Sequence, residues 1–463
     1  MKKALALTLV LLLLTVSAFA CAASELNEGT DVQYTENVLY GDREALKGVR
    51  VNIESAYRYK LLWDTDFFPE SNSVQTDFSL HEFLEINADA DDYSIVISTN
   101  YNRLFSEDHM PLAKIFREME EKQQRVKYVQ LKDYSDYYPL KINLEAKDPA
   151  SQNGTRYIYS DSMAAAASND LLDAITDFFK IPVLSDEELR LYVIHDNYGN
   201  VSRTVDDSAA ADNFRFDSLC AAGRDGCFFT FNAHHPSGAV VDTSEIPGGF
   251  GIYYISFSID DETGTLKSLS NVCPLDPEII PIVLSINSDK TQLRLISLEN
   301  SLAVLTVIDA KTMEIIQRTE FPELGEAPVF WDYFVYDDFI VFWTRNDDLL
   351  LAAQNGSGLF ETEIFCPAYA EGMPEQVFDY KNTVMDYNGE RLVITHSPTG
   401  ATDMYNYDRC GVSITIFDKT GPIYQGIYTS SLDVANAFEN APRSCSAGYY
   451  PPTPSFYETE GAP

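Results

Sequence analysis

The chain has 463 residues and a formal net charge of −38 at pH 7, from 71 acidic and 33 basic residues. A field of this sign repels phosphate backbones and anionic lipid headgroups, so we expect no nucleic-acid partner and no membrane contact other than a lipid anchor. A hydrophobic content of 45% and an aromatic content of 13% suffice for a substantial core and exclude a globally disordered chain.

The first 20 residues have the three parts of a bacterial secretory signal. Lys2 and Lys3 supply the positive start, an apolar run extends from Ala4 to Val16, and residues 18–20 read Ala-Phe-Ala, a cleavage signature. The apolar run is too short to span a membrane comfortably. The sequence therefore predicts a signal peptide over residues 1–20 and an exported mature chain.

Cys21 directly follows the predicted cleavage site, where bacterial lipoproteins carry the cysteine that is acylated. The preceding residues resemble a lipobox only in part, because Phe19 is bulky and Ala18 replaces the favoured Leu. Two alternatives follow: a cell-surface lipoprotein anchored through Cys21, or a secreted protein. Residues 21–37 are polar and acidic, which predicts a flexible tether.

The cysteine count slightly favours the lipid anchor. If Cys21 is acylated, six cysteines remain, an even number that suits disulfides in an exported protein. Cys220 and Cys227 flank the segment AAGRDG and are the candidate disulfide pair, with buried thiols as the alternative. No C-x-x-C motif occurs, so the sequence does not support a zinc ribbon or thioredoxin-like redox chemistry.

The N-terminal half of the mature chain combines predicted strands with two predicted helices. Short apolar runs separated by turn residues predict strands at Val38–Ile53, Tyr57–Phe68, Phe78–Ile86 and Tyr93–Thr99. Apolar residues recur at helical spacing near residues 108–125 and 162–180, and Pro182 follows the second run. We expect these helices to be insertions into a β framework. A separate α/β subdomain over residues 100–180 is the alternative.

From Leu189 onward the chain consists of predicted strands joined by turns that begin with Asp or Asn. These residues bond their own backbone in turns. The turns lie at Asn197, Asp260, Asp309, Asn355 and Asp418, at intervals of 63, 49, 46 and 63 residues. A period of about 40–50 residues with several strands in each is typical of propeller blades.

Residues 303–316, AVLTVIDAKTMEII, resemble the hairpin of the YVTN and quinoprotein-like β-propeller repeats. Residues 259–264 and 417–421 resemble degenerate copies, so the resemblance covers about residues 250–430. It implies an all-β fold, namely a β-propeller of about seven (six to eight) four-stranded blades over residues 38–440. A resemblance of this kind implies no chemistry.

A closed ring also predicts which strands pair at the two ends of the propeller. We expect Val38–Ile53 to pair with the strands of the last blade, near Val412–Tyr428. The Pro-rich residues 441–463 are predicted to form a partly disordered tail.

Few residues suggest chemistry. His234 and His235 are adjacent, and adjacent strand residues point to opposite faces, so we interpret them as loop or surface histidines. Asn87–Asp92 resembles the start of a calcium loop, but Asp92 stands at the glycine position and Ser98 at the final glutamate position. No G-x-S-x-G, Walker or G-x-G-x-x-G motif occurs. The sequence predicts no catalytic residue and no metal site, and it indicates no cofactor.

Three functions remain open. The first is a non-catalytic binding or sensory scaffold outside the cytoplasm, with an envelope protein or a glycan as partner, because propellers present loops around a channel. The second is a secreted glycan hydrolase or lyase that uses acidic residues in the propeller funnel. Convergent carboxylates beside aromatic residues would distinguish it from the first. The third is a calcium-dependent surface protein.

Overall fold

The computed structural model describes most of the predicted folded body. The residues it describes are 15–17, 32–57, 61–80, 93–101, 110–146, 166–167, 169–195, 201–205, 214–223, 226–260, 263–325, 330–344, 347–373, 383–396, 411–430, 447–449 and 452–457. Within these ranges, no helix is both long and apolar enough to cross a membrane. Of the predicted signal peptide, the structure describes only residues 15–17. Cys21, the segment Asn87–Asp92 that resembles a calcium loop, and the turn at Asn197 lie outside the described residues.

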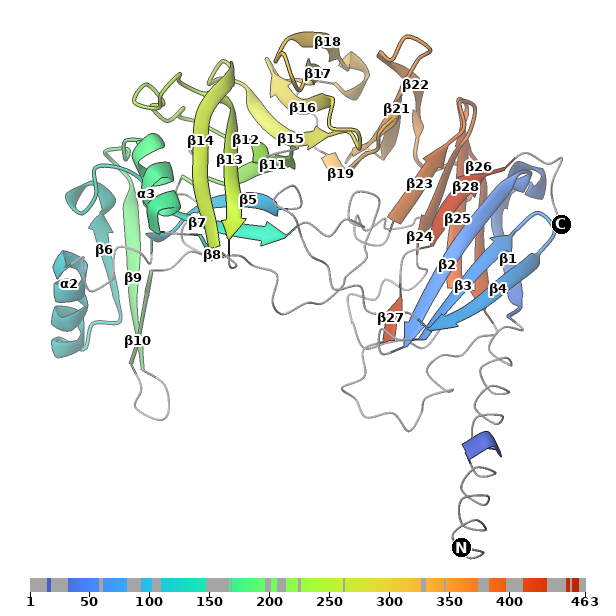
Figure 1. Ribbon diagram of the computed structural model, residues 1–463, viewed down its shortest axis with the longest axis horizontal. Helices are drawn as coiled ribbons and strands as arrows, with labels where there is room; N and C mark the ends of the chain where they lie inside the picture. The colour runs from blue at the N-terminus through green and yellow to red at the C-terminus, as the bar shows by residue number, and fades with distance from the viewer. Residues whose placement is uncertain are drawn as a thin grey trace, which may run out of the picture. The chain divides into compact units, whose positions relative to one another are not determined.

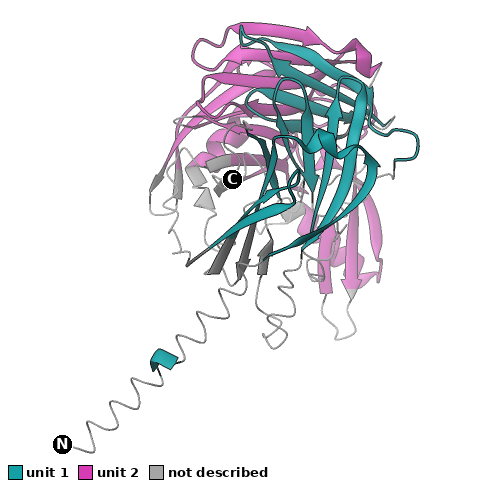
Figure 2. Ribbon diagram, turned by 90° about the vertical axis from the view of Figure 1, so that its right-hand side faces the viewer, with its two compact units in different colours: residues 1–86, 150–158, 329–463 teal, residues 87–149, 159–328 magenta. Residues whose placement is uncertain are grey.

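The chain divides into two compact units, coloured separately in Figure 2. Unit 1 comprises residues 1–86, 150–158 and 329–463, and unit 2 comprises residues 87–149 and 159–328. The described strands form seven sheets, five of which contain four or five strands. Successive antiparallel four-stranded meanders confirm the predicted all-β propeller class.

Unit 2 contains two complete blades (Figure 1). The first consists of β11 (Ser218–Ala222), β12 (Gly226–Phe231), β13 (Gly251–Asp260) and β14 (Thr263–Pro274), with β8 (Ala166–Ala167) parallel to β14. The second consists of β15 (Ile280–Ile286), β16 (Gln292–Glu299), β17 (Leu302–Asp309) and β18 (Ile315–Glu320), followed by the 3-10 helix η7 (Pro322–Leu324).

Both predicted helices are present in unit 2, as α2 (Met110–Glu121) and α3 (Asn169–Phe178). Two smaller sheets accompany them. They contain β5 (Tyr93–Thr99) with β7 (Leu140–Ala146), and β6 (Val126–Gln130) with β9 (Glu188–His195) and β10 (Val201–Val205). The 3-10 helix η4 (Leu131–Asp133) follows β6. One core cluster joins Phe116 of α2, Ile175 of α3 and Tyr253 of β13. The helices therefore share the core of unit 2.

Unit 1 contains the remaining sheets. One blade consists of β19 (Phe330–Val335), β20 (Phe339–Thr344), β21 (Asp348–Gln354) and β22 (Phe360–Pro367). The next consists of β23 (Thr383–Tyr387), β24 (Leu392–His396), β25 (Gly411–Asp418) and β26 (Gly421–Ser430), with β1 (Tyr34–Gly41) as a fifth strand. The third contains β2 (Val49–Tyr57), β3 (Leu61–Phe68), β4 (Ser73–Leu80), β27 (Ala447–Tyr449) and β28 (Thr453–Phe456). The 3-10 helix η1 (Arg43–Leu46) connects β1 to β2.

The Asp- and Asn-led turns occupy one equivalent position in four consecutive blades. Asp260, Asp309, Asn355 and Asp418 each lie at the hairpin between the third and fourth strands of a blade. Asp309 Oδ1 accepts the backbone N–H groups of Lys311 and Thr312 at 2.9 and 2.7 Å. These bonds hold the pKa of Asp309 below its usual value. The predicted period thus corresponds to the blade repeat.

The two ends of the chain pair with each other in unit 1, through two separate ladders. β1 pairs antiparallel with β26, from Tyr34 opposite Ser430 to Gly41 opposite Tyr424. This confirms the predicted closure for Val38–Gly41, and it places residues 34–37 of the expected tether in a strand. β2 does not join that blade. It pairs with β28 of the Pro-rich tail, from Val49 opposite Phe456 to Asn52 opposite Thr453.

Side chains reinforce the first closure. Glu36 Oε1 accepts hydrogen bonds from the hydroxyls of Tyr424 and Tyr428 at 3.0 and 2.9 Å. The two hydroxyls also lie 2.7 Å apart. Arg43 Nε lies 3.1 Å from the same carboxylate oxygen. The carboxylate of β1 thus satisfies hydroxyl groups that β26 buries.

Candidate ligand-binding site

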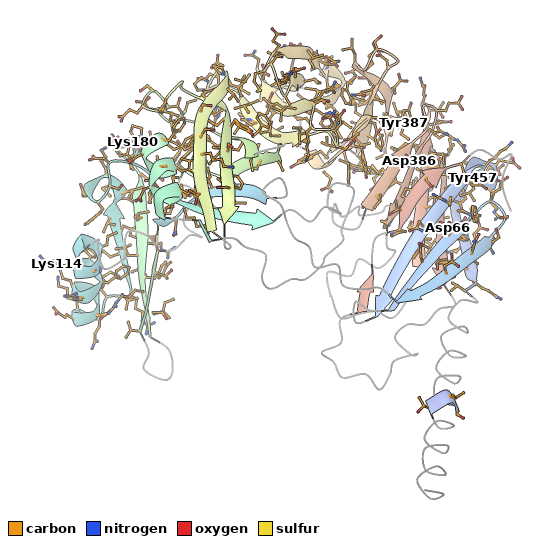
Figure 3. All side chains as sticks on the ribbon, in the orientation of Figure 1. Asp66, Lys114, Lys180, Asp386, Tyr387 and Tyr457 are labelled. Atoms are coloured by element: carbon orange, nitrogen blue, oxygen red, sulfur yellow. The ribbon has the colours of Figure 1, made fainter. Side chains whose placement is uncertain are left out.

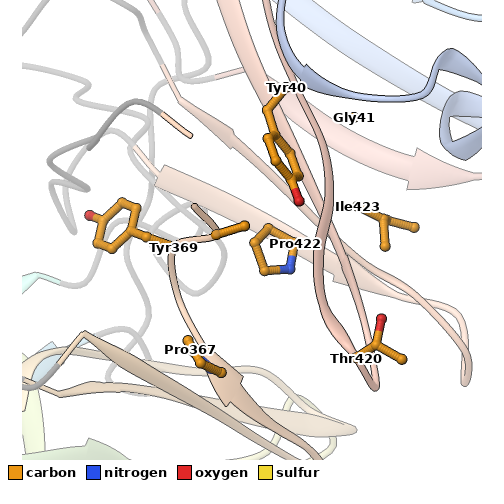
Figure 4. A pocket seen from close by; sticks show the side chains of 8 residues that line it. Tyr40, Gly41, Pro367, Tyr369, Thr420, Pro422 and Ile423 are labelled. Carbon is orange, nitrogen blue, oxygen red and sulfur yellow. The ribbon is translucent and has the colours of Figure 1, made fainter. Parts of the chain in front are cut away.

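Unit 1 contains a pocket of about 430 Å³, shown in Figure 4. This volume lies within the usual range of small-molecule sites, about 300–1,000 Å³. Three chain segments form it: the end of β1, the loop after β22 and the turn between β25 and β26. The lining residues are Tyr40, Gly41, Pro367, Tyr369, Ala370, Thr420, Pro422 and Ile423.

Backbone features of the sequence bring these segments together. Gly41 has φ of +76°, and a Cβ there would lie 1.9 Å from the carbonyl oxygen of Ile423. Only glycine lets β1 approach β26 this closely. Pro367 ends β22, and Pro422 follows Gly421, which itself has φ of +128°. The ladder between β25 and β26 shifts register between Ile416 and Phe417, beside this turn.

The pocket combines flat apolar surfaces with hydroxyl groups. Figure 4 shows the ring of Tyr40 directed toward Pro422, with Tyr369 on the side opposite Ile423. Two prolines and two tyrosine rings provide the flat surfaces. The tyrosine hydroxyls can donate or accept hydrogen bonds, and Thr420 Oγ1, which donates to Asp418, can accept one. This composition is typical of a site that binds a ring and orients it by its polar groups.

None of the eight lining residues carries a carboxylate, an imidazole, a thiol or an amine. Three charged residues directly adjoin lining residues in sequence, namely Asp42, Glu371 and Lys419. Lys419 Nζ donates to Glu363 Oε2 at 2.9 Å. Asp418 Oδ1 accepts the backbone N–H and the hydroxyl of Thr420 at 2.7 and 2.6 Å, so it fixes the turn. The lining can therefore bind a ligand, but it contains no carboxyl group.

Sequence reasoning did not identify this pocket. Its residues come from positions near 40, 370 and 420, and only the pairing of β1 with β26 brings them together. The local signal was present in the Pro, Gly and Tyr residues beside turns, but turns along the whole chain share that composition.

The predicted disulfide pair lies in unit 2, on adjacent strands. In the β11–β12 ladder, Cys220 is opposite Phe229 and Cys227 is opposite Ala222, and the structure holds both as thiols. The two cysteines are diagonal neighbours, a relation that places Cα atoms about 7–8 Å apart. A disulfide usually needs Cα atoms about 4.4–6.8 Å apart. Formation of the bridge would thus require backbone movement, and the pairing stays a prediction, as does acylation of Cys21.

The histidines occupy different environments. His396 is buried at the end of β24, and its burial lowers its pKa to about 4. His234 Nδ1 lies 3.1 Å from Asn232 Oδ1. His235 lies on the neighbouring turn and contacts the buried carboxylate of Glu187, at 3.2 Å. His81 and His109 lie outside the described residues. Among the residues that the structure describes, no group of three His, Cys, Asp or Glu side chains is arranged to hold a metal ion.

Comparison with known proteins adds no family. No protein-family model matches this chain, and no curated protein matches it. Similar solved structures include a candidate 6-phosphogluconolactonase from Bacteroides fragilis, with 9% identity, a TM-score of 0.29, and coverage of 89% of this chain and 99% of that chain. A second candidate 6-phosphogluconolactonase, from Bacteroides uniformis, has 10% identity, a TM-score of 0.29, and coverage of 82% and 100%. A protein from Lactobacillus plantarum has 9% identity, a TM-score of 0.27, and coverage of 82% and 99%.

At TM-scores this low, we infer neither chemistry nor ligand from these likenesses. The assignment to the propeller class rests on the blades themselves. The finer resemblance to YVTN and quinoprotein-like repeats stays a prediction.

Proposed function

We propose that this protein is a binding scaffold outside the cytoplasm whose pocket in unit 1 recognises sugar rings of a glycan without catalysis at that pocket. The observation that carries the proposal is the lining itself. Tyr40, Tyr369, Pro367 and Pro422 offer flat apolar surfaces, and no lining residue carries a carboxyl group. A pyranose ring has an apolar face and a hydroxyl edge, which match these surfaces and the Tyr and Thr hydroxyls.

The lining favours binding over glycan hydrolysis at this pocket. Hydrolysis of a glycosidic bond usually needs two carboxyl groups on either side of the bond. The pocket has the aromatic residues of a glycan site without those carboxyl groups. The segment that resembles a calcium loop, Asn87–Asp92, lies outside the described residues, so the calcium-dependent role stays a prediction.

The cellular location belongs to the same proposal. The signal peptide predicted over residues 1–20 supports export, and Cys21 supports a lipid anchor as the alternative to secretion. Globomycin treatment of producing cells tests the anchor, since it blocks signal cleavage of lipoproteins and would leave a larger precursor. A Cys21→Ser chain is the matched control. Normal processing in both cases would contradict the lipoprotein alternative.

Binding is tested with the full mature chain and soluble oligosaccharides, by calorimetry and affinity electrophoresis. We expect at least one oligosaccharide to bind, and Tyr369→Ala to raise its Kd by about tenfold, equivalent to about 1.4 kcal/mol. Tyr369→Ala removes one of the flat surfaces on which the sugar ring stacks. Phe365→Ala is the control, because Phe365 is an aromatic residue of β22 that is 41% exposed and does not line the pocket.

Two results would contradict the proposal. One is the absence of binding to every oligosaccharide in a panel of neutral and charged glycans. The other is a Kd that responds equally to Tyr369→Ala and Phe365→Ala, since binding would then occur elsewhere on the molecule.

A further inference from the structure

Unit 2 buries one carboxylate completely and supplies it with donors from three directions. The side chain of Glu187 has 0% exposure. Tyr138 donates its hydroxyl to Oε2 at 2.7 Å, and the backbone N–H of Phe214 donates to Oε1 at 3.0 Å. A buried carboxylate held by several donors is fixed in position.

The third contact of Glu187 is with His235. The ring atom Nε2 of His235 lies 3.2 Å from Glu187 Oε2, and 11% of the histidine side chain is exposed. On the other side of the ring, the backbone N–H of Ser237 donates to Nδ1 at 3.0 Å. Since Nδ1 accepts this bond, the ring proton resides on Nε2 and points at Glu187.

The hydroxyl of Ser237 contacts the ring nitrogen of His235 that does not face Glu187. Ser237 Oγ lies 2.7 Å from Nδ1 of His235, and Ser237 is exposed to solvent. The turn is held by bonds from His235 N to Ala239 O and from Gly238 N to His235 O, both 2.8 Å. A nucleophile bonded to a base, with the base oriented by a third group, is the general arrangement of activated serines.

We propose that Ser237, His235 and Glu187 form a nucleophilic centre that hydrolyses carboxylic esters with small acyl groups at the surface of unit 2. Ser237 and His235 are the catalytic residues, and Glu187 is a positioning residue that acts through His235. This centre does not depend on the pocket of unit 1, and it would add an activity to the binding function.

The reaction follows from the contacts. Ser237 Oγ bonds to the acyl carbon while its proton moves to Nδ1 of His235, and Glu187 stabilises the resulting imidazolium. The backbone N–H of Ser237 then loses its acceptor and can donate to the developing oxyanion. The bond from carbon to the alcohol oxygen breaks, and Nδ1 returns the proton to that oxygen. Water attacks the acyl-serine in the same way, which releases the acid and restores Ser237.

A small acyl group is required because Ser237 lies on an exposed turn. Residues 236–239 are all exposed, so the described residues of this turn do not enclose the hydroxyl. The reactivity of Ser237 is tested with a fluorophosphonate probe, which forms a P–O bond to an activated serine with loss of fluoride. The full mature chain is treated with the probe, and mass spectrometry locates the adduct.

We expect one adduct, on Ser237, and none on Ser237→Ala. Ser244→Ala is the matched control, because Ser244 is also an exposed serine of a nearby turn, bonded through its N–H to Asp242. His235→Ala should slow labelling by about 10²–10⁴-fold, and added imidazole should restore part of the rate. If His235 were only structural, added imidazole would not restore the labelling rate of His235→Ala.

A second measurement addresses Glu187. With p-nitrophenyl acetate, Glu187→Gln should lower kcat by about 10²-fold or more at unchanged KM, because the amide cannot stabilise the imidazolium. Circular dichroism confirms the fold of each variant. The proposal is overturned if the folded natural chain shows no adduct on Ser237, or if Ser237 is labelled at the same rate in His235→Ala.

Discussion

At the scale of single residues, the cost of burying a titratable side chain is most visible at His396. It is 8% exposed at the end of β24, and burial lowers its pKa to about 4 from the ordinary 6.5. Between these two values the unfolded chain binds a proton that the folded chain does not bind. The contribution of His396 to the free energy of unfolding is therefore largest above pH 6.5 and falls as the pH drops toward 4.

This predicts a pH-dependent difference between the natural chain and His396→Gln. Lowering the pH from 7 to 4 should reduce the free energy of unfolding of the natural chain by about 2–3 kcal/mol more than that of the variant. Urea unfolding at several pH values measures both. The comparison removes the contribution of the acidic residues, which titrate alike in the two chains. Parallel pH profiles would show that His396 is not protonated on unfolding.

Only part of the proposed nucleophilic centre could be recognised from the sequence. The pair His234 and His235 was visible in the sequence, but its interpretation as loop residues missed the partner of His235. Glu187 lies 48 positions earlier and is one of 71 acidic residues. The fold of unit 2 brings Glu187 and His235 together, and no local sequence pattern encodes that contact.

At the scale of elements, the hairpins were predictable and the tail strand was not. Asp309 and its counterparts mark one turn of each blade because their side chains bond the next backbone N–H groups, which is a local effect. β28 contains Pro454 and lacks alternation of apolar and polar residues, so its sequence resembles a loop. Its strand conformation depends on its partner β2, and Pro is tolerated where a strand lies at the edge of its ladder.

The closure by β1 yields a prediction for Glu36. Glu36→Ala removes the acceptor of the Tyr424 and Tyr428 hydroxyls and the partner of Arg43. We expect a loss of about 2–4 kcal/mol in the free energy of unfolding, because buried hydroxyls lose a charged acceptor. Urea unfolding measures it. Glu44→Ala, at an exposed position of η1, is the control and should change stability by less than about 0.5 kcal/mol.

At the scale of the whole chain, closure by the tail predicts the effect of truncation. Removal of residues 452–463 takes away β28, the Pro452 oxygen that accepts from Thr395 Oγ1 at 2.5 Å, and the Phe456 N–H that donates to Asp386 at 3.0 Å. Figure 3 labels Asp386 on β23. Asp386 would lose one of its donors, and Val49–Asn52 of β2 would lose their pairing with β28.

We expect this truncation to lower the melting temperature by at least about 5 °C and to broaden the transition, as followed by calorimetry. Removal of residues 458–463 alone is the control, because it leaves β28 intact. If both truncations melt like the full chain, the ladder between β2 and β28 contributes nothing to stability.

The double closure also has a consequence for the time at which the protein can fold. β1 and β2 are synthesised first, but their partners in β26 and β28 are about the last strands to be made. Tyr34 and Ser430 are separated by nearly the entire chain, which at about 5–20 residues per second corresponds to roughly 20–80 s of synthesis. During that interval both N-terminal strands present open edges, which are prone to aggregation. Holding the nascent chain unfolded until its C-terminus is available would therefore protect it.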